Sequence, residues 1–220
     1  MFEKNNEHNQ AEMAGEVISG FQYNNSVMGE AFYMLMLRVK RLSDVNDTIP
    51  LIISERMIDV SESLEGRYIH VTGQFRSYNQ YVNKRSRLIL SVFVKSIELL
   101  DGEEHNMPNS IFLEGYICRE PVFRNTYHGR SITDVMVAVP RDYGRSDYIP
   151  CIVWGRNAAY VARQPVGTCL KLWGRAQSRV FRQKIAEGEY VSRNAYEISV
   201  NHLERVSQPE AEPARVAEDQ

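Results

Sequence analysis

The chain has 220 residues, 43% of them hydrophobic, and a formal net charge of −2. This composition can bury a core, which excludes a disordered chain, and no apolar run reaches the roughly 18 to 20 residues that a membrane helix needs. The polar N-terminal residues lack the apolar stretch of a secretory signal, so a cytoplasmic protein is expected.

Reactive and metal-binding motifs are missing from the sequence. Cys118, Cys151 and Cys169 lie far apart with no histidine at ligand spacing, which predicts small buried side chains and no disulfide framework. The five histidines are scattered, and neither a G-x-x-x-x-G-K-[ST] loop nor an H-E-x-x-H motif occurs. We therefore expect no enzyme activity, no metal and no cofactor, with an OB-fold nuclease as the alternative among enzymes.

Composition divides the chain into five segments. Residues 1–14 lack hydrophobic periodicity and are predicted to form a disordered tail, residues 102–108 a linker, and residues 207–220 a disordered acidic tail. The domains expected between them cover residues 15–101 and 109–206. From residue 108 to residue 206 there are fourteen Lys and Arg against nine Asp and Glu, which permits phosphate binding without indicating it alone.

The two domains are copies of one another. Residues 29–41 align with 129–141, and residues 49–53 with 149–153, at a constant offset of 100. The remaining matches are Gly66 with Gly167, Gly73 with Gly174, and the upstream segment 17–20 with 112–115. An ordered series of this kind indicates a duplicated domain.

Five strands and a short helix are predicted for the second copy. The strands are expected at 110–117, 132–139, 147–154, 168–178 and 195–204, the helix at 157–162, and a polar hairpin at 182–193. A helix between the third and fourth strands is the arrangement of an OB fold. The predicted fold is all-β, with two tandem OB-fold five-stranded Greek-key barrels, although a generic small β-barrel has the same periodicity.

Several separated motifs of the second copy resemble bacterial single-stranded DNA-binding proteins. The matching runs follow that family's order and lie at residues 109–124, 137–141, 148–162, 174–179 and 196–204. The resemblance implies a duplicated OB-fold member that binds single-stranded DNA without chemistry, in replication, recombination or repair. It also implies a bacterial, nucleoid-associated location. Family members with two barrels per chain are typically dimers, so a homodimer is expected.

The family's four base-stacking positions fall on aromatic residues of this chain, namely Tyr143, Tyr148, Trp154 and Phe181. Flat side chains stack on bases of any sequence, each for about 1–3 kcal/mol, and basic residues hold the phosphates. The expected phosphate contacts are Arg141, Arg145, Arg156, Arg175, Arg179, Arg182 and Lys184. Trp173 alternates away from Leu170 and Leu172, so it is expected at an interface or along the DNA path.

The first copy departs from this pattern. Its equivalent positions hold Ser43, Thr48, Ser54 and Gln80, none of them aromatic. We expect the first barrel to have lost this stacking surface and to support assembly. Its hairpin between strands four and five fits two interpretations equally well, some remaining binding capacity or an ordinary solvated hairpin. The residues of this cluster are Tyr78, Tyr81, Lys84, Arg85 and Arg87.

Two alternatives to DNA binding remain at the level of sequence. The acidic C-terminal segment lacks the terminal Pro-Phe of the family, which puts the usual tail partners in doubt. This loss, with the altered first copy, fits an OB-fold adaptor of a replication-restart assembly that binds DNA weakly or not at all. RNA is the alternative ligand, because stacking platforms accept either sugar.

Overall fold

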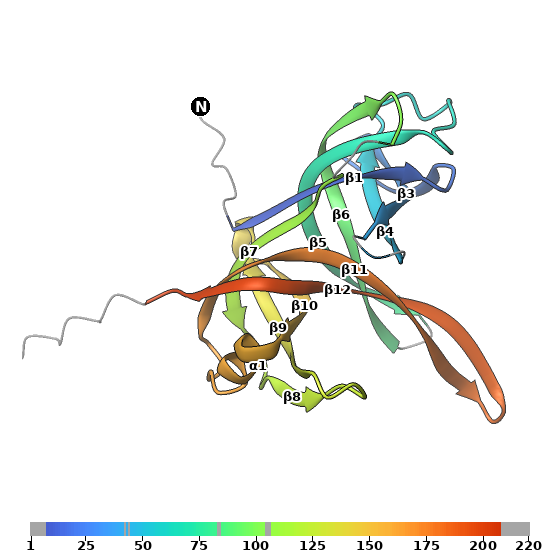
Figure 1. Cartoon of the computed structure of the whole chain (residues 1–220). Helices are drawn as coiled ribbons and strands as arrows, with labels where there is room; N and C mark the ends of the chain where they lie inside the picture. The colour runs from blue at the N-terminus through green and yellow to red at the C-terminus, as the bar shows by residue number, and fades with distance from the viewer. Residues whose placement is uncertain (1–7, 42, 44, 83–84, 104–106, 208–220) are drawn as a thin grey trace, which may run out of the picture.

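The structure is a computed structural model that describes residues 8–41, 43, 45–82, 85–103 and 107–207. Within this part of the chain, twelve strands join into one continuous sheet that curls into two barrels (Figure 1). The strand order is β2-β3-β4-β6-β5-β1-β7-β11-β12-β10-β9-β8. No helix of the described residues combines the length and the apolar character needed to cross a membrane.

The first barrel contains strands β1 to β6. Their bounds are Asn9–Val17, Gln22–Val27, Glu30–Lys40, Asn46–Ser54, Tyr68–Val82 and Arg85–Leu100. The barrel closes because β1 pairs with both β3 and β5, while β4 runs parallel to β6. Turns occupy most of residues 55–67, between β4 and β5.

The second barrel repeats this topology. Its strands β7 to β12 span Asn109–Ile117, Val122–Asn125, Ser131–Pro140, Ser146–Trp154, Cys169–Ala186 and Glu189–Arg205. β7 pairs with β9 and β11, β10 runs parallel to β12, and helix α1 (Gly155–Val161) connects β10 to β11. The predicted order of strands and helix, and with it the OB fold, is confirmed.

Period-2 alternation explains why these segments form strands around a core. In β7, Ile111, Leu113 and Ile117 are buried, whereas the intervening Phe112 and Tyr116 face outward. Successive side chains of a strand point to opposite faces, so one apolar face fills the barrel. The edge strands β2 and β8 are exposed at every residue. β8 was not predicted, because it has no buried face to impose a pattern.

The repeat extends further toward the N-terminus than the sequence alignment suggested. A Cβ atom on Gly15 would lie 2.1 Å from the carbonyl oxygen of Arg38, and one on Gly115 would lie 2.6 Å from that of Ala138. These two close approaches are related by the offset of 100. Gly20 has open space instead. The predicted match of 17–20 with 112–115 is therefore wrong, and the structural partner of Gly115 is Gly15.

Part of the predicted N-terminal tail is a strand. β1 begins at Asn9, and its buried Ala11 and Met13 alternate with the exposed Gln10 and Glu12. The Asn9 amide donates to the carbonyl oxygen of Phe75 at 2.8 Å and accepts from its N–H group at 2.9 Å. These bonds depend on a distant strand, which is why local periodicity missed them. Residues 1–7 and 208–220, and residues 104–106 of the linker, lie outside the described residues.

Long strand pairs form an arm on each barrel. β11 continues to Ala186 and β12 begins at Glu189, so the predicted polar hairpin at 182–193 is a paired two-stranded arm. Its outer part projects beyond the barrels in Figure 1 (orange to red). β5 and β6 form the corresponding arm of the first barrel.

The barrels join along β1 and β7, which pair antiparallel and lie side by side in Figure 1. Asn9 faces Leu113, Ala11 faces Ile111, and Met13 faces Asn109. Positions 9 and 13 correspond to positions 109 and 113 of the repeat, so exchanging the two barrels turns the first of these pairs into the last. The barrels are therefore related by an approximate twofold axis near Ala11 and Ile111. One chain thereby builds a symmetric two-barrel unit.

Candidate nucleic-acid interface

The four predicted stacking residues are all exposed. Tyr148 and Trp154 are 45% and 37% exposed and share one face of β10, opposite the buried Ile149, Cys151 and Val153. Phe181, on β11, is 36% exposed. Tyr143, with a left-handed φ of 61°, is 98% exposed in the short 3-10 helix η1 (Asp142–Gly144).

Trp154 is held at one edge of its indole ring. Its Nε1–H group donates to the hydroxyl of Ser199 at 3.1 Å, which fixes the ring while leaving part of it exposed. The indole lines a surface pocket of about 410 Å³. The other residues of this pocket are Arg41, Arg130, Arg175, Gln177, Ser178, Arg179, Glu197 and Ser199.

Phe181 lines a second and more apolar pocket of about 230 Å³. The guanidinium carbon of Arg179 lies 5.8 Å from the centre of its ring, a cation–π distance. The other lining residues are Arg87, Leu88, Ile89 and Leu90 of β6, with Pro150, Asn194, Ala195 and Tyr196 of the second barrel. This pocket therefore lies between the two barrels.

The predicted phosphate contacts fall into two groups. Arg141, Arg175 and Arg179 each lie within 4 Å of a carboxylate, that of Asp147, Asp47 and Glu197 respectively. Three others, Arg145, Arg156 and Arg182, are exposed and have no ion pair among the described side chains. The side chain of Lys184 lies outside the described residues. The second group has the guanidinium groups most open to phosphate.

Two buried carboxylates at the junction of the barrels were missed by sequence reasoning. Asp47 has no exposed surface, and it accepts from the Arg41 guanidinium at 2.7 and 2.6 Å and from the Ser178 N–H group at 2.6 Å. Asp147, its equivalent, accepts from the Ser77 N–H group at 2.7 Å. The sequence does carry a signal for these two carboxylates, because the same residues recur in both copies: Asp47 with Asp147, and Arg41 with Arg141.

At this junction, burial and pairing with charged or hydrogen-bonding neighbours shift the pKa values of an aspartate and two arginines, and the two effects oppose each other. Desolvation raises the pKa of Asp147, and hydrogen bonds from Ser77 together with the charge of Arg141 oppose this shift only in part. The hydrogen bond to Asp47 raises the pKa of Arg41, whereas burial and the nearby Arg41 lower that of Arg175. Arg175 is therefore bound within the junction and is not a freely exposed cation.

The first barrel has a different surface at the position of Trp154. Ser54 is buried, and its hydroxyl donates to the carboxylate of Glu30. Phe93 of β6 packs against Phe32 with ring centres 5.6 Å apart, and the guanidinium of Arg76 lies over Phe93 at 5.1 Å. Phe32 and Arg76 thus both contact the half-buried ring of Phe93.

The other first-barrel positions also lack a stacking ring. Ser43 and Gln80 are exposed, and the backbone N–H of Thr48 donates to the hydroxyl of Ser178 at 2.9 Å. On the hairpin, Tyr78 and Arg87 are exposed. The other three hairpin residues lie outside the described part of the chain, Lys84 entirely and Tyr81 and Arg85 by their side chains.

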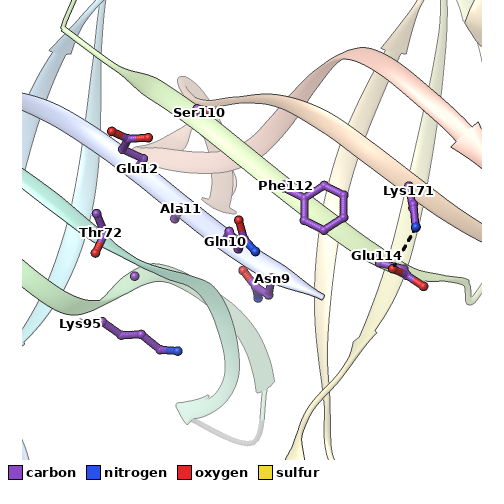
Figure 2. Close-up of a pocket in the computed structure, with 11 residues that line it drawn as sticks. Asn9, Gln10, Ala11, Glu12, Thr72, Lys95, Ser110, Phe112, Glu114 and Lys171 are labelled. Atoms are coloured by element: carbon purple, nitrogen blue, oxygen red, sulfur yellow. Dashed lines mark ion pairs between the residues drawn. The ribbon is translucent and has the colours of Figure 1, made fainter. Parts of the chain in front are cut away.

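Trp173 belongs to a separate cluster on the outer face of the sheet. Its ring lies between those of Phe112 and His202, with centres 5.1 and 5.0 Å away. Figure 2 shows the neighbouring hollow over the β1–β7 seam, which has a volume of about 630 Å³. Phe112 projects into it beside Glu114 and Lys171, whose charged atoms are 3.9 Å apart.

Comparisons with known proteins agree with this architecture. The model of the single-strand binding protein family matches residues 108–206. Among curated proteins, the single-stranded DNA-binding proteins of Oceanobacillus iheyensis and Enterococcus faecalis are 30% and 28% identical over 93 residues. Each alignment covers 39% of this chain, and it covers 58% and 50% of the respective relative. The chain thus spans little more than half the length of these relatives.

The likeness to a solved structure covers both barrels. The wild-type single-stranded DNA binding protein from Thermus aquaticus aligns with 93% of this chain and 96% of its own, with a TM-score of 0.70 and 20% sequence identity. At that identity the likeness shows the fold alone. The second barrel is thus similar in sequence to the single-strand binding protein family, and the chain as a whole shares the fold of the Thermus protein, with two OB folds.

Proposed function

We propose that this chain binds single-stranded DNA, largely independently of sequence and without chemistry, on the second barrel. The observation that carries the proposal is that Tyr148, Trp154 and Phe181 remain exposed while arginine side chains lie around them. Exposed rings offer stacking to bases, and guanidinium groups offer contacts to phosphates. The names of the matched relatives support the same ligand.

A homodimer is part of the proposal. Phe112, Trp173 and His202 form an aromatic cluster on the outer face of the shared sheet, away from Trp154. Large rings on a sheet face are typical of contacts between subunits. Sedimentation equilibrium of the full chain should give twice the chain mass, and Trp173→Glu should give the monomer mass. A wild-type monomer would contradict the dimer.

The same proposal includes a cellular role in replication, recombination or repair and a nucleoid-associated cytoplasmic location.

The alternative function is that of an OB-fold adaptor. The observation that favours it is the first barrel, where Arg76 covers the ring of Phe93 and Ser54 is buried. An adaptor would keep the two-barrel architecture and bind DNA weakly. Retention of the exposed rings in the second barrel favours DNA binding over this alternative.

A tryptophan-fluorescence titration with oligo-dT at low and high salt tests the proposal. The chain has two tryptophans, so Trp173→Phe leaves Trp154 as the reporter of the site. We expect quenching that weakens with salt, since phosphate contacts release counterions. No quenching, and no binding of a labelled oligonucleotide, would support the adaptor instead. Competition between oligo-dT and oligo-U then separates DNA from RNA binding.

A further inference from the structure

We propose that the first barrel, despite its lost stacking surface, completes the DNA site by placing one arginine in each of two stacking pockets of the second barrel. Arg41 shares a pocket with Trp154, and Arg87 shares a pocket with Phe181. This inference rests on the proposed function. The ligand group is the sugar-phosphate backbone of the strand whose bases stack on the second barrel.

The Trp154 pocket is rich in guanidinium groups from both barrels. Arg41 enters from the first barrel and joins Arg130, Arg175 and Arg179 of the second. Glu197 is the carboxylate of the lining, and it is 6% exposed and accepts from the Gln177 amide at 2.8 Å. The buried Asp47 also pairs with Arg41 and Arg175, so four guanidinium groups stand against two carboxylates. This excess of positive charge suits a phosphate beside a stacked base.

Arg41 is rigidly positioned for this contact. Both of its bonds to Asp47 come from one fork of the guanidinium, and a third, longer bond reaches the carbonyl oxygen of Ser178 at 3.4 Å. Its side chain is still 23% exposed. A cation held in this way loses little conformational entropy when a phosphate binds.

The Phe181 pocket has a different chemistry. Leu88, Leu90 and Pro150 form apolar walls around the ring, and Arg87 stands exposed at the rim. No ion pair of Arg87 is found among the described side chains. An apolar slot with a cation beside it suits a base that stacks on the ring while its phosphate pairs with the exposed guanidinium.

The junction fixes the first barrel beside both pockets. The Tyr148 N–H group donates to the hydroxyl of Ser77 at 2.7 Å, and the Thr48 N–H group donates to that of Ser178 in the equivalent contact. Each barrel's arm thus crosses a strand of the other barrel. A strand of DNA leaving Trp154 or Phe181 therefore meets the first barrel directly.

Arg87→Ala tests the inference, because Arg87 is exposed and its loss spares the core. Affinity for a labelled dT oligomer of about 30 nucleotides, longer than the roughly 4–16 that one OB fold covers, is measured across salt concentrations. Loss of one phosphate contact should reduce the slope of log affinity against log salt by about 0.7. The matched control is Arg67→Ala, an exposed arginine of the first barrel that lines neither pocket.

The outcomes separate this inference from the proposed function. A reduced slope in Arg87→Ala, restored in Arg87→Lys and absent in Arg67→Ala, supports the composite site. Equal slopes for Arg87→Ala and Arg67→Ala would overturn it, even while Trp154→Ala weakens binding. Arg41→Lys, checked for unchanged thermal unfolding, should also weaken binding, since lysine cannot keep the bidentate bond to Asp47 and face a phosphate. Failure of the wild type to bind at all would instead remove the proposed function.

Discussion

Trp154 and Ser54 end equivalent strands of the two barrels, yet their side chains meet different surroundings. Trp154 keeps a partly open ring anchored by Ser199, whereas Ser54 is buried against Glu30. At the position of Ser199 the first barrel carries Phe93, since Cβ atoms on Gly174 and Gly73 would meet the carbonyl oxygens of these two residues. The first barrel thus has its aromatic ring on the neighbouring strand, where Phe32 and Arg76 contact it.

Trp154→Ala should weaken binding of labelled oligo-dT by about 5- to 150-fold, which corresponds to the roughly 1–3 kcal/mol of one base–aromatic stack. Fluorescence anisotropy of the oligonucleotide measures this without relying on the tryptophan signal. Trp173→Phe is the matched control, because it keeps an aromatic ring in the outer cluster. Equal affinities of Trp154→Ala and the wild type would show that the indole does not stack on DNA.

The exposure of Tyr148 and Trp154 could be predicted from sequence, but the pairing of the arginines could not. Tyr148 and Trp154 alternate with apolar residues along one strand, so their exposure follows from strand periodicity. Arg175 looks equally free in the sequence, yet Asp47, which lies in the other barrel, pairs with it at 3.2 Å. A contact between residues 128 positions apart leaves no local pattern.

In the second copy, the strands with one buried face were predicted, and β8, which is exposed at every residue, was not. β10 has buried Ile149, Cys151 and Val153 at every second position. The outer arm of β11 and β12 is exposed on both faces for much of its length, so its sequence resembles a polar loop. Backbone hydrogen bonds between the two strands hold it together, and these carry no side-chain signal.

Gly115→Ala should lower the free energy of unfolding by about 1–3 kcal/mol, the usual range for overpacking a tight site. The new Cβ atom would lie 2.6 Å from the carbonyl oxygen of Ala138, so β7 and β9 must move apart. Urea unfolding followed by circular dichroism measures the change. Gly20→Ala is the control, since its Cβ atom meets open space. Equal effects at the two sites would mean that the strands adjust freely.

For the whole molecule, the β1–β7 seam and the crossed arms join two diverged barrels into one unit. The seam buries Ala11 and Ile111, and each crossing places a fully buried aspartate against the backbone of the other barrel. The first barrel therefore shares equivalent junction contacts with the second, although its four corresponding surface positions carry no aromatic residue. Its Asp47 and the second barrel's Asp147 differ in their partners, because Arg41 holds Asp47 through two short bonds and Arg141 reaches Asp147 at 3.4 Å.

Asp147 should therefore make the stability of the two-barrel unit depend on pH. Burial raises its pKa above the ordinary value of 3.8, so the folded chain holds this proton more tightly than the unfolded chain. The stabilising contribution is complete below about pH 3.8 and is lost as the pH rises through the folded-state pKa. The free energy of unfolding of the wild type, relative to Asp147→Asn, should accordingly fall as the pH rises from about 3.8 toward neutral.

Urea unfolding of both proteins across this range measures the difference, and the asparagine keeps an oxygen to accept from the Ser77 N–H group. The same substitution at the exposed Asp142 controls for the loss of one negative charge. A difference that rises with pH would show that the ionised carboxylate is stabilised by Arg141 and Arg76 more than it is destabilised by burial. The opposite trend, which we expect, would mean that Asp147 fixes how the barrels dock at some cost in stability near neutral pH.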